Sequence, residues 1–178
     1  MMRTELLDNG HLWLRIVDPA WVDPLDPTFA QRHGGWWNPP HSFPTLYLNE
    51  DLSTARINLR TFIASWPYEP EDLRSDTGPC LVTARLPRQQ RTGDVHTPAG
   101  VAAADLPATY PLDGHGQLVS QHRCQAIGAD ANRQGLRGIH CRSARTPAGA
   151  GRELAWFPAT GRSRAHLVST QAFDAWYY

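Results

Sequence analysis

The stretch Gly34–Leu48, GGWWNPPHSFPTLYL, decides how the rest of the chain can be read. Its glycine pair and its proline pair predict a stiff, irregular loop, and its end, Thr45–Leu48, predicts a short strand. The two adjacent tryptophans are costly to expose in such a loop. Each tryptophan alone is explained as well by capping the core. Pre-shaped loops beside strands are also where ligand sites form, so the stretch is equally a candidate wall of a small-molecule site.

After this stretch the pattern changes to that of a helix. Asn49–Ser65 is predicted to be helical, with acidic Glu50 and Asp51 in its first turn, where negative charge suits the helix dipole. Its apolar residues fall on one face at steps of three and four. They are Leu52, Ala55, Leu59, Phe62 and Ile63.

Strands are predicted on both sides of the stretch, with three Asp-Pro pairs between residues 18 and 27 favouring turns. Residues 94–111 form an ordered excursion, residues 120–126 start either a helix or a strand, and the aromatic tail is expected to dock on the body. Helices and strands mix without regular alternation, which favours an α+β fold in one domain over residues 1–178. The predicted strands are His11–Val17, Cys80–Leu86, Gly138–Ala144 and Glu153–Phe157.

Composition excludes several classes of protein. The 178 residues carry 17 basic and 17 acidic side chains, and every basic residue is arginine. A neutral chain lacks the basic excess of a dedicated nucleic-acid binder. No apolar run is long enough for a membrane helix, and the N-terminus is not a secretory signal, so we expect a cytoplasmic protein.

Cysteine and histidine spacing argues against metal binding. Cys80, Cys124 and Cys141 are odd in number and far apart, which predicts buried free thiols and no disulfide framework or zinc knuckle. The eight histidines show no paired spacing. No metal site is therefore expected.

Several motifs together resemble the RES-domain family. They are RIV, GG-x-WNPP, PTLYLNED, GI-x-x-RSAR and RELAWF, in this order between Leu12 and Phe157. The resemblance implies an ADP-ribosyltransferase-like fold, with a strongly bent, mixed or antiparallel sheet and flanking helices. It also implies NAD as substrate. Family members include toxins that destroy NAD by phosphorolysis or hydrolysis, while others modify a protein. Their partners are helix-turn-helix antitoxins whose C-terminal part plugs the active site.

The resemblance assigns roles to single residues. Arg15 matches an arginine that suits the pyrophosphate of NAD, because its planar fork grips phosphate. Tyr47 matches a tyrosine that stacks on or orients a ring of NAD, and Ser143 a serine that bonds the ribose or the nicotinamide amide. The loop residues Trp36, Trp37 and Asn38 complete the expected NAD-binding set.

Two positions depart from the family pattern. Trp36 stands where the family has a second arginine, and Asn58 stands where it has a glutamate. A carboxylate matters because cleavage of the glycosidic bond develops positive charge on the ribose. Another acid could substitute, the candidates being Glu50, Asp51 and, most attractive, Glu153 close after the serine strand.

The lost arginine has candidate replacements in the same helix. Arg56 and Arg60 are four positions apart and share one helix face. The remaining explanation is a weak or inactive enzyme.

Three functions therefore stay open from the sequence. The favoured one is an NAD-consuming, toxin-like enzyme with Arg15, Tyr47 and Ser143 in its site. The others are an ADP-ribosyltransferase acting on a protein or small molecule, and a catalytically silent nucleotide- or antitoxin-binding module. Phosphate is a candidate co-substrate, and the sequence leaves a homodimer open.

Overall fold

A computed structural model describes residues 1–67 and 69–178. In this part of the chain eight strands form one sheet, in the order β1-β5-β6-β7-β3-β2-β4-β8. The strands are β1 (Thr4–Leu6), β2 (Leu12–Val17), β3 (Leu46–Asn49), β4 (Cys80–Arg85), β5 (Arg91–Val95), β6 (Gly138–Arg142), β7 (Arg152–Trp156) and β8 (His166–Gln171). The helices are α1 (Thr28–His33), α2 (Leu52–Ile63), α3 (Pro98–Ala103), α4 (Gln121–Arg133) and α5 (Phe173–Trp176), with short 3₁₀ turns at Pro70–Asp72 and Pro147–Gly149.

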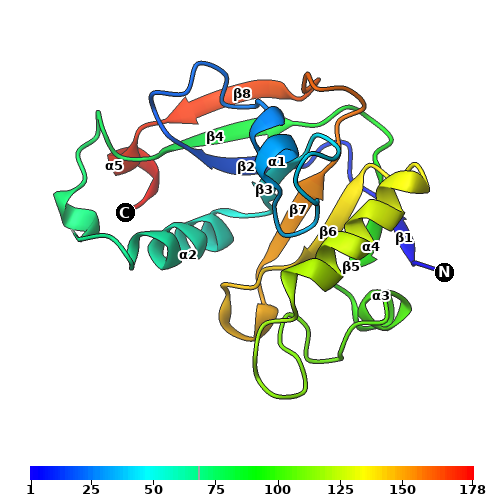
Figure 1. The fold of residues 1–178 in the computed structure, drawn as a ribbon. Helices are drawn as coiled ribbons and strands as arrows, with labels where there is room; N and C mark the ends of the chain where they lie inside the picture. Colours follow the sequence, from blue (N-terminus) through cyan, green and yellow to red (C-terminus); the bar gives the residue numbers. More distant parts are fainter. Residues whose placement is uncertain (68) are drawn as a thin grey trace.

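The sheet is mostly antiparallel and strongly bent. Each neighbouring pair is antiparallel except β5 and β6, which run parallel. The half made of β2, β4 and β8 runs in a clearly different direction from the half made of β5, β6 and β7 (Figure 1). The predicted α+β fold with a bent, largely antiparallel sheet and flanking helices is confirmed.

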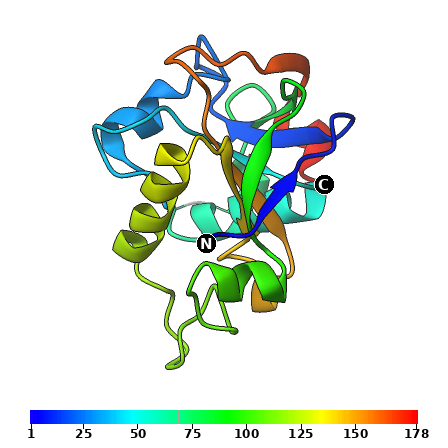
Figure 2. The same ribbon diagram turned by 90° about the vertical axis from the view of Figure 1, so that its right-hand side faces the viewer.

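Helices cover the two halves of the sheet separately. α2 and α5 lie against the β2–β4 half, and α3 and α4 lie against β5 and β6. Turning the molecule shows α4 and the C-terminus at opposite ends in both views (Figure 2). The described helices include none long and apolar enough to span a membrane.

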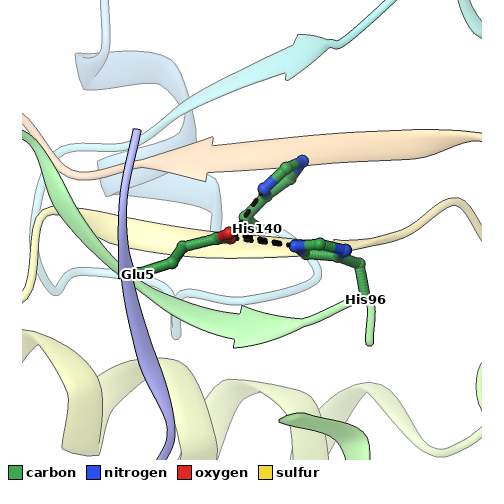
Figure 3. Close-up of side chains that lie close together, drawn as sticks. All are labelled: Glu5, His96 and His140. Carbon is green, nitrogen blue, oxygen red and sulfur yellow. Dashed lines mark hydrogen bonds and ion pairs between the residues drawn. The ribbon is translucent and has the colours of Figure 1, made fainter. Parts of the chain in front are cut away.

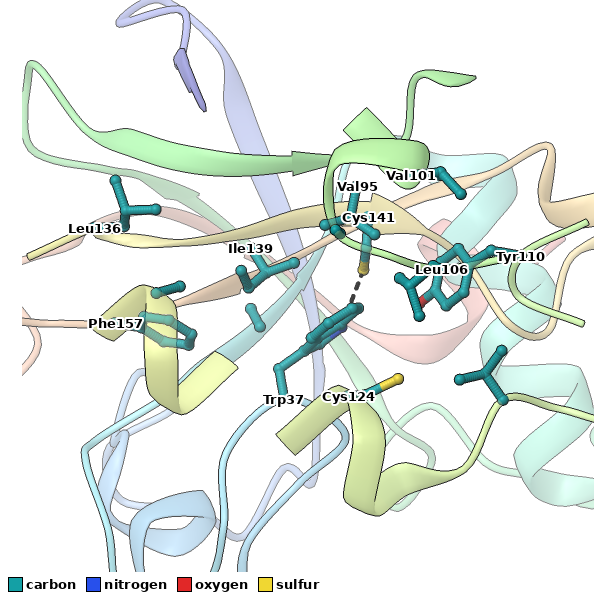
Figure 4. Close-up of a cluster of buried hydrophobic side chains, with 14 residues drawn as sticks. Trp37, Val95, Val101, Leu106, Tyr110, Cys124, Leu136, Ile139, Cys141 and Phe157 are labelled. Carbon is teal, nitrogen blue, oxygen red and sulfur yellow. Dashed lines mark hydrogen bonds between the residues drawn. The ribbon is translucent and has the colours of Figure 1, made fainter. Parts of the chain in front are cut away.

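Three buried clusters hold these layers together. The first lies between β5–β7 and helices α3 and α4, with Trp37 at its centre (Figure 4). The second fills the inside of the bend with side chains such as Trp13, Leu48 and Leu154. The third joins α2 to the C-terminal segment through Leu59 and Trp176, so the aromatic tail docks as expected. The cysteines are free, as the sequence predicted; Cys124 and Cys141 are buried as expected, whereas Cys80 is only half-buried.

Helix α2 is shorter than its apolar pattern suggested. Asn49 is still the last residue of β3, paired with Glu153, so the helix cannot begin there. Asp51 is instead the N-cap, with extended backbone and a side chain that accepts from the Thr54 amide at 2.7 Å. The prediction that Phe62 lies on the buried face is wrong: it is 53% exposed, because Ile63 continues the buried row.

Three strands have no clear sequence signal. β1 has three residues, β5 is the polar segment RTGDV, and β8 is exposed throughout. The ambiguous segment near residue 120 is helix α4, which begins where the Ser120 side chain accepts from the Arg123 amide. The excursion at residues 94–111 contains α3.

Gly128 lets α4 pack directly on the glycine- and proline-rich loop that holds Trp37. A Cβ at Gly128 would overlap the carbonyl oxygen of Trp37. Alanine in a helix is normally about 1 kcal/mol more stable than glycine. Here we expect Gly128→Ala to lower the free energy of unfolding by about 1–3 kcal/mol, the usual effect of overpacking.

Urea denaturation followed by circular dichroism measures this change. Gly114→Ala is the control, because nothing lies within 4 Å of a Cβ there; it should stay within about 0.5 kcal/mol of the wild type. A Gly128→Ala variant as stable as the wild type would contradict this packing.

Candidate functional site

A cavity of about 510 Å³ opens where the bent sheet meets the Gly34–Trp37 loop and α2. Residues from β2, β3, β6, β7 and α2 reach it, together with the loop after β6. The residues that carry polar or aromatic groups into it include Arg15, Trp36, Tyr47, Asn49, Asn58, Tyr110, Arg142, Arg145 and Glu153.

Strand alternation builds the floor of this cavity. Tyr47 and Asn49 of β3 pair with Ala155 and Glu153 of β7. Glu153 in turn pairs with Cys141 of β6. Because residues two apart share a face, these side chains all point to one side of the sheet. Their neighbours point to the other side and fill the buried cluster inside the bend.

Four polar side chains form a hydrogen-bonded network at this floor. Asn49, Asn58 and Glu153 line the cavity, whereas Ser143 lies beneath them and is not among the lining residues. The Glu153 carboxylate accepts from Ser143 Oγ at 2.6 Å and from Asn58 Nδ2 at 2.5 Å. Asn58 Nδ2 also donates to Asn49 Oδ1 at 2.6 Å. Asn58 and Ser143 are buried, at 6% and 0% exposure. The structure therefore brings together Ser143, Asn58 and Glu153, three candidate site residues from distant segments of the sequence.

The Tyr47 hydroxyl holds the loop in shape. It accepts from the Trp37 amide at 2.8 Å and donates to Asn38 Oδ1 at 2.8 Å. Burial raises the pKa of Tyr47 well above its ordinary value, so the group stays a phenol that can do both. A Cβ at Gly35 would overlap this hydroxyl, so the position has room only for glycine.

Arg15 lines the cavity and is anchored at one end. Its Nη1 donates to the carbonyl oxygens of Pro24 at 2.9 Å and Asp26 at 3.4 Å. Burial lowers its pKa to about 10, against the opposing effects of Asp26 and Asp23, so it is charged at neutral pH. A guanidinium has five N–H donors, which leaves capacity for an anion in the cavity.

Of the three loop residues expected to bind NAD, Trp36 and Trp37 line the cavity and Asn38 does not. Trp36 lines the cavity and is half-buried. Trp37 reaches the cavity with part of its ring, but it is 2% exposed and its indole N–H donates to Cys141 Sγ. Asn38 is fully buried, donates to the Ala30 carbonyl at 2.7 Å, and is not among the lining residues. The structure thus gives Asn38 a role in the loop and does not bring it to the cavity.

The arginines suggested as replacements lie elsewhere. Arg56 donates to the carbonyl oxygens of Trp176 and Tyr178 and so holds the C-terminal segment. Arg60 lines a second cavity, of about 520 Å³, beside that segment. The cavity of the polar network contains Arg142 and Arg145 instead. Sequence reasoning missed both, although they stand in the quoted GI-x-x-RSAR motif.

Arg142 and Arg145 differ in what they can do. Arg142 donates to the backbone carbonyls of His96, Ala108 and Tyr110, so it fixes the loops around it. Arg145 is exposed, and its backbone amide donates to Ser143 Oγ at 3.3 Å. Together with Arg15 they outnumber the single carboxylate of Glu153, so the cavity favours an anionic ligand.

The alternative acids are also placed away from the network. Asp51 is the N-cap of α2, and its carboxylate accepts a hydrogen bond from the Thr54 amide. The Glu50 carboxylate lies 3.8 Å from Arg152 Nε and 3.6 Å from His140 Nε2. Of the three acids considered, Glu153 alone lines the cavity. Cys141 is no nucleophile there, because burial raises the pKa of its thiol well above the ordinary value.

Fold and cavity define a class: an α+β domain with a bent, mostly antiparallel sheet and a polar cavity at the bend. The chain belongs to the RES domain family, whose model matches residues 12–177. A comparison with curated proteins found no match. Among solved structures, the chain is similar to one in the crystal structure of the M. tuberculosis MbcT–MbcA toxin–antitoxin complex. The TM-score is 0.73 at 20% identity, covering 97% of this chain and 91% of that one.

Tyr47→Phe tests whether the hydroxyl supports the loop. The change leaves the Trp37 amide and Asn38 Oδ1 without their partner, which we expect to cost about 1–3 kcal/mol of unfolding free energy. Urea unfolding measures it. Tyr178→Phe is the control, since Tyr178 is 64% exposed and should change little. Equal stability of the two variants would rule out the supporting role.

Proposed function

We propose that this chain is an NAD-consuming enzyme that cleaves the bond between nicotinamide and ribose, and that it acts as a toxin of a toxin–antitoxin pair. One observation carries the proposal. The Glu153 carboxylate is fixed at the floor of an arginine-rich cavity by Ser143 and Asn58. Membership of the RES domain family supports NAD as the substrate.

The reaction needs a negative charge near the ribose. As the bond from C1′ to the nicotinamide nitrogen breaks, its electron pair leaves with nicotinamide and positive charge develops on the ribose. Glu153 supplies a carboxylate to stabilise that charge. Asn58 and Ser143 orient it, since each donates to the same oxygen, Oε1. An acceptor oxygen, from phosphate or water, then bonds to C1′.

Arginine suits the other end of the substrate. The pyrophosphate of NAD is anionic and planar guanidinium groups bind it through paired hydrogen bonds. Arg15 of β2 and Arg145, in the segment after β6, both line the cavity and are the candidates for this contact. Arg145 then takes over the role of the family arginine that Trp36 replaces. The Trp36 ring, half-buried in the same cavity, is a surface on which a ring of NAD can stack.

An antitoxin partner belongs to the same proposal. The structurally similar chain comes from a toxin–antitoxin complex. Phe29 and Leu118 line the cavity and are 58% and 47% exposed, which leaves apolar surface at its mouth for a partner to cover. We propose a helix-turn-helix antitoxin as that partner, encoded by a neighbouring gene.

Incubating the purified protein with NAD, with and without phosphate, tests the activity. We expect NAD to fall and free nicotinamide to appear. ADP-ribose 1″-phosphate should form with phosphate and ADP-ribose with water. An unchanged NAD pool at high protein concentration would reject the proposal. Loss of NAD only after a cell extract is added, with labelled ADP-ribose on a protein, would establish the transferase alternative instead.

Glu153→Gln tests the carboxylate. The amide keeps the shape and removes the charge, so we expect the rate of NAD cleavage to fall by about 10²–10³. The neighbouring Asn58→Glu change should not restore a family-like site in the wild-type background. It would place a second carboxylate where Asn58 Nδ2 now lies, 2.5 Å from Glu153 Oε1. Because two carboxylates so close together cannot both be ionised, we expect activity to fall as well.

The double variant Asn58→Glu with Glu153→Gln is the matched control. It moves the carboxylate to the other end of the same hydrogen bond, and we expect it to be more active than either single variant. A more active Asn58→Glu single variant would show that Glu153 is not the working acid. Circular dichroism confirms that each variant is folded.

Arg145→Ala tests the pyrophosphate contact without disturbing a loop. We expect NAD binding to weaken by about 1.5–3 kcal/mol in calorimetry, the range for hydrogen bonds to charged groups. Arg15→Ala should weaken binding similarly, but it also frees the Pro24 and Asp26 carbonyls, so its stability must be measured in parallel. Arg85→Ala, exposed on β4, is the control. Unchanged affinity in Arg145→Ala would remove this residue from the site.

A further inference from the structure

Three metal-ligand side chains converge at a place that the proposed reaction does not use. Glu5 of β1, His96 after β5 and His140 of β6 bring one ligand atom each within 4.8 Å of the others. Both imidazoles point at the Glu5 carboxylate, as Figure 3 shows. Glu5 Oε1 lies 2.7 Å from His140 Nδ1 and 3.0 Å from His96 Nε2.

The cluster lies on the side of β6 away from the NAD cavity. His140 and Cys141 are consecutive in a strand, so their side chains point to opposite faces. Cys141 lines the cavity, while His140 contacts the Trp13 ring inside the bend, with centroids 5.5 Å apart. Both imidazole side chains are 7% exposed, and Glu5 is 30% exposed. The site is thus nearly enclosed, with one side reachable from solvent at Glu5.

Among the described residues, one ring nitrogen of each histidine in the cluster has no hydrogen-bond partner. Each histidine uses one ring nitrogen toward Glu5. In the described part of the chain, the other nitrogens, His96 Nδ1 and His140 Nε2, are buried without a hydrogen-bond partner. Buried polar atoms of this kind are rare in folded proteins.

Binding of a metal ion would let the outward ring nitrogens donate hydrogen bonds. Metal binding takes the proton from the inward nitrogen of each imidazole, and the proton of a neutral ring then sits on the outward nitrogen. For His140 that nitrogen is Nε2, which lies 3.6 Å from Glu50 Oε1. Metal-ligating histidines commonly donate their outer N–H to such a carboxylate. Glu50 is therefore in place as the outer partner.

We propose that Glu5, His96 and His140 bind one Zn²⁺ ion. Two imidazole nitrogens and one carboxylate oxygen are a donor set that zinc accepts, with water as the fourth ligand. The ion joins the edge strand β1 to β5 and β6, which also pair through their backbones and through the ion pair of Arg3 with Asp94. Its role is to stabilise this end of the sheet. No metal was expected because the histidines show no paired spacing; only the fold brings the three residues together, since Glu5 is 91 positions from His96 and 135 from His140.

Zinc titration of the untagged full-length protein, stripped with a chelator, tests the proposal near neutral pH. We expect one equivalent of Zn²⁺ to bind, and Co²⁺ to bind at the same site with a visible spectrum of nitrogen and oxygen ligation. His96→Gln and Glu5→Gln should lower the zinc affinity by at least the roughly 10–100-fold that loss of an outer partner costs. Glu50→Gln should fall within that range. His122→Gln, an exposed histidine on α4, should leave the affinity unchanged.

The proposal fails if the wild type binds zinc no more tightly than the His96→Gln/Glu5→Gln double variant, or if His122→Gln abolishes binding. A second measurement covers variants that do not fold. Nuclear magnetic resonance of the folded wild type should show zinc shifting the imidazole signals of two histidines, with a melting temperature that rises with zinc concentration. Shifts in other histidines alone, or none, would overturn the proposal.

Discussion

The pairing of β3 with β7 is the constraint on which the rest of the structure depends. With Asn49 opposite Glu153, Tyr47 and both of these side chains point into the cavity, while Leu48 and Leu154 point into the core. The side-chain period of a strand is two, so a slip of one residue would exchange the two faces. Polar groups would then enter the core and leucines would line the cavity. The same register therefore secures both the fold and the chemistry.

The cavity differs from the family pattern in where its charges are attached. The carboxylate expected on α2 is absent, because Asn58 occupies that position, and Glu153 approaches the same point from the neighbouring strand. The two residues share a hydrogen bond, so the carboxylate lies at the other end of that bond from the position the family pattern predicts. The arginine expected in the loop is likewise replaced by Trp36, and Arg145 reaches the cavity from the segment after β6. Under the proposed function, Glu153 and Arg145 supply the charges that the family pattern places at Asn58 and Trp36.

Much of the fold was predictable because local signals were strong. Alternating residues marked β2, short segments typical of strands marked β4, β6 and β7, and the glycine- and proline-rich stretch marked the loop. β1, β5 and β8 were missed, because short, polar or exposed strands have no such pattern and exist through pairing with neighbours. The Phe62 error has a related cause, since apolar spacing alone cannot decide between two adjacent residues at the edge of a helix face.

The sequence by itself determined the type of fold, the loop that shapes the cavity and the identity of Arg15, Tyr47 and Ser143 as candidates, because these depend on motifs and short-range periodicity. Tertiary structure decided which acid meets Asn58, which arginine shares the cavity, and that Asn38 and Arg56 serve the scaffold. The reason is physical. Contacts between strands and helices far apart in the chain depend on sheet register and on the bend, and spacing along the sequence carries no record of either.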